Sequence, residues 1–392
     1  MEHFNMEYLV VGCGLSGAVI ARHLAERGNK VMIWERRNHI AGNMYDYHDE
    51  YGILVHKYGP HTFHTRKKAL YDFMCQWGEW ESYNLECMAY FMGKFTPTPF
   101  NFQTIDDFYA PAEAEMLKAR IKAYFGARSE ATVLEVLECP DEVIRKYGEF
   151  LFAHDYSLYT AKQWGIPVDK VDASIFERVP LRFSYETGYF KNEYQMMPKE
   201  SFTGIFENIL AHKNIEVKLG IEALEHLSVD KENNVILLDG IKCPYTVIYT
   251  GALDELFGAD LGALPYRSLR FEWHHEDIES KQPAALVAYP EAEGYTRIVE
   301  FSKLPVQKGK GTTYEIEYPL QYQQGETQEP YYPLLTESSK ALAASYKARA
   351  DKIANFYYCG RLADFKYYNM DQALERALDI CTKLDLYSRS CV

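Results

Sequence analysis

The chain has 392 residues, of which 47% are hydrophobic, so it is long enough to bury a large core in two or three domains. Its formal net charge of −14, from 42 basic and 56 acidic residues, argues against nucleic acid as a partner, because binding phosphates requires a basic surface. No apolar run reaches the ~18 residues of a membrane span. Eight cysteines without CxxC spacing, and no signal-peptide pattern at the N-terminus, favour free thiols in a reducing cytoplasm.

The first predicted elements form a strand, a glycine-rich turn and a helix. A hydrophobic strand over residues 8–11 leads into the turn. Gly12 permits a tight turn, Gly14 lets the backbone approach a pyrophosphate, and Gly17 lets the helix pack close to the strand. A second strand ends at Glu35, where dinucleotide-binding folds place an acidic residue on a ribose hydroxyl. Because a helix N-terminus attracts anions, the pattern predicts an adenine-dinucleotide site.

The following segments alternate between helical, strand and dinucleotide-fold patterns. Residues 104–164 have helical spacing, and Thr132 with Glu135 predicts a capping box. Residues 267–318 alternate like an antiparallel sheet, and the strands expected at 246–250 and 356–360 return to dinucleotide-fold patterning. The fold class we expect is α/β, with a discontinuous Rossmann-like domain of residues 1–86, 200–262 and 337–392, an inserted helical domain of residues 104–170, and an antiparallel β-sheet domain of residues 87–103, 171–199 and 263–336.

Separated motifs occur along the whole chain, at residues 35–43 (ERRNHIAGN), 58–65 (YGPHTFHT), 159–165 (YTAKQWG), 180–183 (PLRF), 194–198 (YQMMP), 295–297 (YTR), 329–333 (EPYYP) and 360–372 (GRLADFKYYNMDQ). Together and in this order they resemble bacterial UDP-galactopyranose mutase. A generic flavin-binding fold would reproduce only the first of them.

The resemblance implies a flavoprotein isomerase of cell-surface polysaccharide biosynthesis. Members of that family interconvert the pyranose and furanose forms of UDP-galactose on FAD that is active when reduced. N5 of the reduced flavin attacks the anomeric carbon, UDP leaves and later returns, and there is no net redox change. A nucleotide-sugar substrate and a homodimer are therefore expected.

The resemblance also assigns roles to particular residues. The catalytic candidates are two arginines for the pyrophosphate and a histidine and an arginine at the flavin: Arg182, Arg297, His61 and Arg361. A planar guanidinium can hold a diphosphate while it gains charge and departs. The substrate-binding candidates, in which Trp164 belongs to a mobile loop over the base, are Tyr159, Trp164, Tyr194, Tyr331, Tyr367 and Asn369. The FAD-binding candidates are Gly12, Gly14, Ser16, Gly17, Glu35, Arg36, Gly42, Asn43, His61, Arg361 and Met370.

Other interpretations of the same residues remain open. The arginines could form surface salt bridges, and the tyrosines and Trp164 could simply fill the core. Three histidines in nine residues, His56, His61 and His64, raise the question of a metal site, but their spacings of five and three fit no common ligand pattern, so we expect no metal.

The chain departs from the family pattern near the sugar and nucleotide. Asn369 stands where the family usually has an aspartate, and Asp155 where it usually has an apolar residue. The substrate is therefore open between UDP-galactose and a sister substrate, dTDP-fucopyranose or UDP-N-acetylgalactosamine, and the retained His61 counts against the N-acetyl sugar. An ordinary FAD oxidoreductase and a non-catalytic nucleotide-sugar binding protein are the remaining alternatives.

Overall fold

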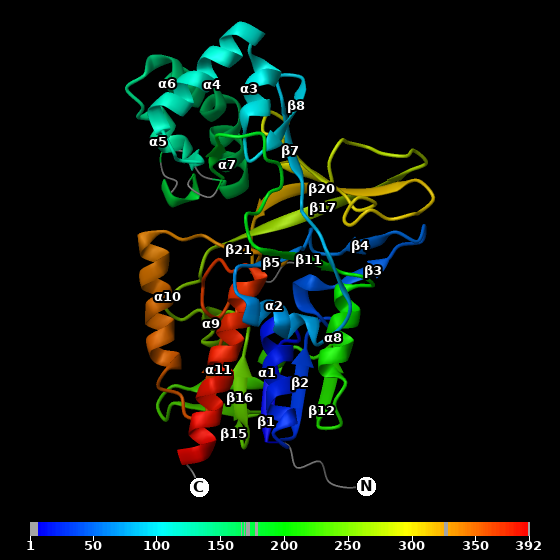
Figure 1. The fold of residues 1–392 in the computed structure, drawn as a ribbon. Coiled ribbons are helices and arrows are strands. Elements are labelled where there is room, and N and C mark those ends of the chain that lie inside the picture. The colour runs from blue at the N-terminus through cyan, green and yellow to red at the C-terminus, as the bar shows by residue number, and fades with distance from the viewer. Residues whose placement is uncertain are drawn as a thin grey trace.

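The computed structural model describes residues 7–165, 167, 169, 173–176, 179–324 and 328–390. Figure 1 shows three parts in a row: a parallel sheet with its helices, a second sheet in the middle, and a group of helices at the far end. Within the described residues, no helix is both long and apolar enough to cross a membrane. Seven cysteines are described and all are free thiols; Cys391 lies outside the described residues.

The parallel sheet contains five strands in the order β12-β2-β1-β16-β22. Their bounds are Ile215–Leu219, Val31–Glu35, Tyr8–Val11, Thr246–Tyr249 and Phe356–Tyr358. Every neighbouring pair is parallel. Helices cover both faces, as the hydrophobic runs of such strands require. The predicted Rossmann-like fold is therefore confirmed.

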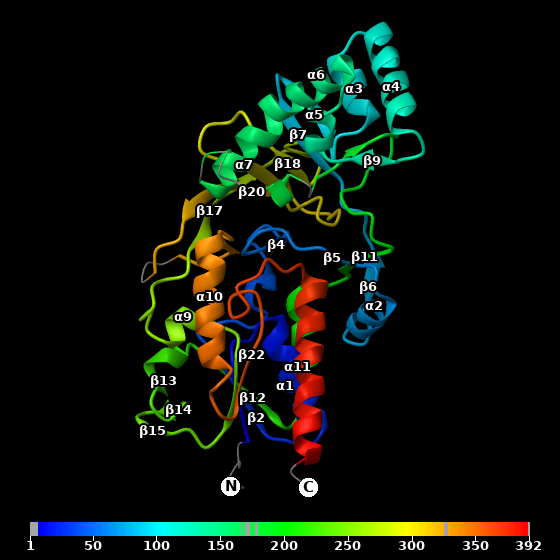
Figure 2. The ribbon, with the colours of Figure 1, turned by 90° about the vertical axis from the view of Figure 1, so that its left-hand side faces the viewer.

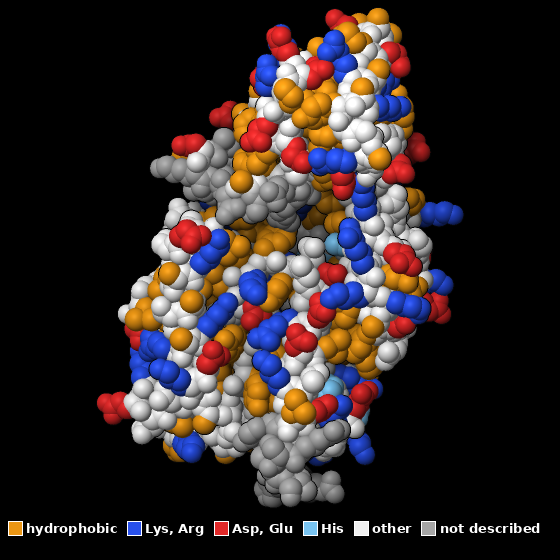
Figure 3. All heavy atoms as spheres, turned by 60° about the vertical axis from the view of Figure 1, so that its left-hand side comes forward, with side chains coloured by type: hydrophobic (Ala, Val, Ile, Leu, Met, Phe, Trp, Pro, Cys, Tyr) orange, Lys and Arg blue, Asp and Glu red, His pale blue; other side chains and the backbone are white. Residues whose placement is uncertain are grey.

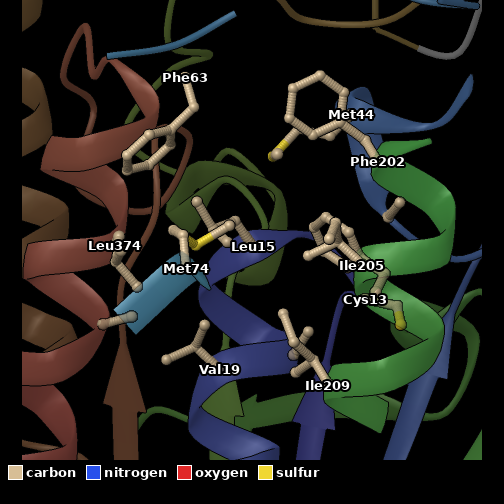
Figure 4. Packing of buried hydrophobic residues seen from close by; sticks show 14 of the residues in the cluster. Cys13, Leu15, Val19, Met44, Phe63, Met74, Phe202, Ile205, Ile209 and Leu374 are labelled. Atoms are coloured by element: carbon tan, nitrogen blue, oxygen red, sulfur yellow. The ribbon is translucent and has the colours of Figure 1, made fainter. Parts of the chain in front are cut away.

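One face of this sheet is covered by α1 (Leu15–Glu26), α8 (Phe202–Leu210) and α11 (Met370–Ser390). Figure 4 shows Leu15 and Val19 of α1 packed between Leu374 of α11 and Ile209 of α8. The opposite face packs against α9 (Leu253–Leu256) and α10 (Glu337–Ala350), where Tyr346 is fully buried. Figure 2 shows α10 and α11 on opposite sides of the sheet.

The middle sheet has seven strands in the order β21-β17-β20-β19-β18-β7-β8. Their bounds are Tyr332–Pro333, Tyr266–Glu276, Thr312–Gln321, Arg297–Glu300, Leu286–Ala288, Cys87–Phe91 and Lys94–Thr98. Five of the six neighbouring strand pairs are antiparallel, as expected, and β18 and β7 pair in parallel. These two strands are far apart in the sequence, so no hairpin dictates their direction.

The helical part contains α3 (Phe102–Phe108), α4 (Pro111–Phe125), α5 (Val133–Leu137), α6 (Glu142–Leu151), a π-helical turn (Phe152–Tyr156) and α7 (Ser157–Trp164). The predicted capping box is confirmed: the Thr132 side chain accepts from the Glu135 N–H at 3.2 Å, and the Glu135 carboxylate accepts from the Thr132 N–H at 2.8 Å. Figure 3 shows the surface hollowed between this part and the rest of the molecule, with hydrophobic side chains along the hollow.

Smaller elements connect these parts. The short strands between the two large sheets are β3 (Asp46–His48), β4 (Leu54–His56), β5 (Phe63–Thr65), β6 (Trp80–Ser82) and β11 (Tyr194–Pro198), with α2 (Lys68–Cys75) between β5 and β6. At the periphery lie β9 (Glu130–Ala131), β10 (Leu181–Arg182), β13 (Leu227–Asp230), β14 (Val235–Leu238) and β15 (Ile241–Lys242). The predicted domain boundaries stay predictions, and the one at 170/171 lies outside the described residues.

Candidate active site

The glycine turn has no room for side chains. Gly12 has φ +99°, a conformation that favours glycine. A Cβ at Gly17 would lie 2.0 Å from the Gly12 carbonyl oxygen, and a Cβ at Gly42 would lie 2.8 Å from Cα of Gly14. No side chain caps α1 and its first turn has no acidic residue, so the N–H groups there are available to an anion. This cradle fits the pyrophosphate of a dinucleotide.

Glu35 fixes the turn from the end of β2. Its buried carboxylate accepts from the backbone N–H of Cys13 at 2.8 Å and of Arg37 at 3.0 Å. A carboxylate has about four acceptor positions, so it retains capacity for a ribose hydroxyl. Arg36 and Arg37 both form ion pairs with Glu329, with N–O distances of 2.5 and 2.8 Å. These ion pairs hold the segment before β21 over the end of the cavity where Glu35 lies.

Every residue predicted to bind the cofactor lines one cavity. Sequence reasoning missed other lining residues that follow the strands β12 and β16: Ile221, Glu222, Ala223, Leu224, Thr250 and Gly251. A general rule was available for them, because ligands of open α/β sheets bind outside the carboxyl ends of the parallel strands. Asn369 and Met370 reach the cavity at the N-terminus of α11.

Two neighbouring histidines, of which His61 lines this cavity, are held in fixed, neutral states. The backbone N–H of His61 donates to His56 Nδ1 at 3.0 Å, and His61 Nδ1 donates to the Gly59 carbonyl at 2.8 Å. Burial lowers the pKa of each imidazole to about 3. A neutral His61 that donates from Nδ1 keeps Nε2 as an acceptor. His64 instead stacks on Phe190, with ring centroids 3.6 Å apart, and does not line the cavity.

No group of three or more metal-ligating side chains suitable for a metal ion occurs in the part of the chain that the structure describes. His56 and His61 have ring centroids 6.2 Å apart, and their Nδ1 atoms are engaged within the protein.

Arg297 meets a buried carboxylate at the centre of the middle sheet. Its Nε lies 2.6 Å from Oε2 of Glu317, which is 1% exposed. The N–H bond of Arg297 Nε is not aligned with the carboxylate oxygen, so the two groups form an ion pair without a hydrogen bond at this nitrogen. Burial lowers the pKa of Arg297, but Glu317 and nearby tyrosines outweigh that effect and raise it well above its ordinary value. The guanidinium is therefore a permanent cation.

Aromatic side chains surround Arg297. Tyr332 stacks on Tyr367 with ring centroids 5.5 Å apart, and the Arg361 guanidinium lies 5.8 and 5.5 Å from the two centroids. Burial raises the pKa of Tyr332 to about 12, and burial also raises the pKa of Tyr159, while Arg297 lowers both. The hydroxyls thus stay protonated and can donate hydrogen bonds to an anionic ligand.

Helix α7, which carries Tyr159 and Trp164, is anchored to the middle sheet by two cations. Lys162 Nζ donates to the carbonyls of Tyr289, Ala292 and Tyr295 at 2.7, 2.7 and 2.8 Å. Arg267 of β17 donates to the carbonyls of Gln163 and Lys162 at 3.0 and 3.3 Å, at the helix C-terminus. Cations there also interact favourably with the helix dipole.

Three residues predicted to contact the substrate lie away from the group around Arg297. The Arg182 guanidinium donates to the carbonyls of Thr187, Gly188 and Tyr189, so its contacts do not join it to Arg297. Tyr194 lies beside Tyr71, with ring centroids 4.7 Å apart.

Tyr331 is buried against Phe271, and its neighbour Tyr332 occupies the position beside Tyr367. Sequence reasoning missed Tyr332 and Glu317. The alternation of side chains along a strand was the signal available for Glu317 on β20, whereas β21 spans two residues and shows no such pattern.

Comparisons with known proteins agree with this geometry. A family profile described as UDP-galactopyranose mutase matches residues 155–367, and one described as an NAD(P)-binding Rossmann-like domain matches residues 10–77. The chain is 32% identical to a dTDP-fucopyranose mutase of Escherichia coli (96% of this chain, 97% of that protein). It is 33% identical to a probable UDP-galactopyranose mutase of Klebsiella pneumoniae (95% and 93%). The crystal structure of a reduced UDP-galactopyranose mutase superposes with TM-score 0.71 at 15% identity, covering 97% of this chain and 95% of that one.

Proposed function

The chain belongs to the UDP-galactopyranose mutase family, and from that premise we propose that it interconverts the ring forms of a nucleotide sugar, using reduced FAD and its own Arg297. Enzymes of this family are isomerases. We take UDP-galactose as the first substrate. The homodimer that the resemblance implies stays a prediction.

FAD fits the cavity at the carboxyl ends of the parallel strands. The glycine turn and the uncapped N-terminus of α1 would hold its pyrophosphate, and Glu35 would hold its ribose. When bound and reduced, FAD supplies a nucleophilic nitrogen for the anomeric carbon and leaves the electron count of the sugar unchanged.

The observation that carries the proposal is the group of Arg297, Tyr332, Tyr367 and Arg361 around one region beside His61. Arg297 would hold the diphosphate while it is detached from the sugar, and the protonated tyrosines would donate hydrogen bonds to its oxygens. An oxidoreductase has no need of such an anion site, so this group favours the mutase over the oxidase alternative.

The remaining residues would bind and orient the substrate. The Trp164 indole on α7 would stack on the nucleotide base, and the two cations that anchor α7 would keep it over the site. Nε2 of neutral His61 would accept a hydrogen bond from a sugar hydroxyl. We carry over Arg182, Tyr194 and Tyr331 from the family resemblance. In this structure the Arg182 guanidinium already donates to three carbonyls.

A dTDP-6-deoxysugar is the second candidate substrate. The dTDP-fucopyranose mutase of Escherichia coli is as similar to this chain as the protein named for UDP-galactopyranose, at 32% and 33% identity. Asn369, at the cavity, also lacks the charge that the family usually has there.

The test is a substrate panel on dithionite-reduced protein. UDP-galactofuranose, dTDP-fucopyranose and UDP-N-acetylgalactosamine are incubated separately, and the ring isomers are separated by chromatography. We expect conversion of the first or second compound without oxygen consumption. Conversion of none of them, with oxygen consumed by an amine or other oxidisable substrate, would contradict the proposal.

A further inference from the structure

Two glutamates lie side by side in the interior of the middle sheet. Glu315 and Glu317 are two residues apart on β20, so their side chains point to the same face. Glu315 is 0% exposed and Glu317 is 1% exposed. Both carboxyl oxygens of Glu315, and Oε1 of Glu317, have no hydrogen-bond partner among the described residues when both groups are ionised.

The charges around this pair do not balance two carboxylates. On β19, Arg297 faces Glu317 and is the nearby cation. On β17, Trp273 lies opposite Glu315 in the register and carries no charge. On β3, Tyr47 is close enough that Glu315 contributes to raising its pKa, after the larger effects of burial, Asp49 and Tyr45. Two buried anions would therefore share one guanidinium.

One proton shared by the two carboxyl groups removes the excess negative charge and gives an unpaired oxygen a partner. Two neighbouring carboxyl groups cannot both ionise in a medium of low polarity, because each negative charge disfavours the other. Burial and then the charge of Glu317 raise the pKa of Glu315 well above its ordinary value, although Arg297 lowers it. A protonated Glu315 can donate an O–H···O⁻ hydrogen bond to Oε1 of Glu317, which gives the orphan oxygen its partner.

We propose that Glu315 is a positioning residue, which holds a proton between itself and Glu317 and thereby fixes Glu317 against Nε of Arg297. The Nη groups of Arg297 then stay directed to the diphosphate of the nucleotide sugar. The proposal rests on the proposed function for that last step alone. Loss of the shared proton adds a second negative charge beside Arg297, and this charge competes with the diphosphate.

The first measurement detects the proton itself and needs neither flavin nor activity. Infrared difference spectra are recorded between the wild-type protein and E315Q at neutral pH. We expect the carbonyl band of a protonated carboxylic acid in the wild type that is missing in E315Q, and we expect it to disappear from the wild type at high pH. A difference spectrum without that band would overturn the shared proton.

The second measurement connects the proton to binding. UDP affinity is measured by calorimetry from pH 7 to pH 10. In the wild type the affinity should fall by up to about tenfold per pH unit once the pair ionises, because binding then requires uptake of one proton. E315Q, whose amide can donate but cannot ionise, should lack this dependence. An equal slope in E315Q and the wild type would refute the proposal.

A second variant separates the hydrogen bond from packing. E315L keeps the volume but cannot donate, so its UDP affinity should be lower than that of E315Q at every pH, and equal affinities would contradict the positioning role. If the wild type binds no UDP at all, the proposed function fails, and the infrared band still decides whether the proton is shared.

Discussion

Replacing Gly17, the glycine of α1 at the dinucleotide-binding turn, offers the sharpest test of the cofactor site. Gly17 lies in α1, where alanine would ordinarily stabilise the helix by ~1 kcal/mol. Here a Cβ would lie 2.0 Å from the Gly12 carbonyl oxygen and 3.2 Å from Cγ1 of Val10. Because the first of these atoms is backbone, the N-terminus of α1 must withdraw by roughly 1 Å or more to reach an ordinary contact.

The expected cost follows from these distances. Overpacking a rigid site costs ~1–3 kcal/mol, and a contact this short belongs at the upper end. After subtracting the gain in helix propensity, Gly17→Ala should lower the free energy of unfolding by about 2 kcal/mol. It should also lose bound FAD, since the displaced N–H groups no longer meet the pyrophosphate.

Gly204 provides the matched control. It also lies in a helix, α8, but a Cβ there would meet only the Ser201 hydroxyl, at 3.2 Å. Gly204→Ala should therefore leave stability unchanged or raise it by up to ~1 kcal/mol, with full FAD content. Both variants are measured by denaturant unfolding and by flavin absorbance per chain. Wild-type stability and flavin content in Gly17→Ala would show that the turn tolerates a side chain at this position.

The other predictions concern the proposed substrate region and its surroundings. Arg297→Ala should reduce turnover about 100- to 1,000-fold with FAD retained, because it removes the cation that faces the diphosphate; wild-type turnover would exclude that role. Trp164→Ala should weaken UDP binding by ~1–3 kcal/mol in calorimetry, as expected for loss of base stacking, and an unchanged affinity would mean that the side chain only packs. Tyr332→Phe should slow turnover more than Tyr331→Phe, since only the first hydroxyl belongs to the group around Arg297, and the reverse order would contradict the site. Burial raises the pKa of Asp155 to about 7 although Lys162 lowers it, so the fold should lose stability as the pH rises from 4 to 7, by at most about 1.4 kcal/mol per unit for this half-buried group. Unfolding curves of Asp155→Asn should lack that loss, and an identical pH dependence in both proteins would contradict the assignment.

The features that the sequence predicted well are those set by neighbours in the chain. The turn after β1 depends on three glycines within six residues, and the nearest contacts of a Cβ at Gly17 would be Val10 and Gly12, although a Cβ at Gly12 would meet the distant Thr250. The capping box before α5 is likewise complete within four residues. The residues predicted to bind the cofactor all line one cavity, but the lining residues that follow β12 and β16 were missed because no local motif marks them.

The features that were missed depend on contacts across the chain. Which of Tyr331 and Tyr332 faces Arg297 is decided by the pairing of β21 with β17, where Tyr332 lies opposite Arg267. The three carbonyls that hold Arg182 belong to an irregular segment with no periodic pattern. The alternation along β20 predicts that Glu315 and Glu317 share a face, but only the tertiary structure shows that this face is buried beside one arginine.

The proposed activity exchanges ring forms of a nucleotide sugar without a net transfer of electrons. The most direct measurement reduces the enzyme anaerobically with one equivalent of dithionite and counts the sugar molecules isomerised per reducing equivalent. We expect many turnovers for each equivalent, with the flavin still reduced at the end, and none with the oxidised enzyme. One product per equivalent, with the flavin oxidised as it forms, would contradict the proposed activity.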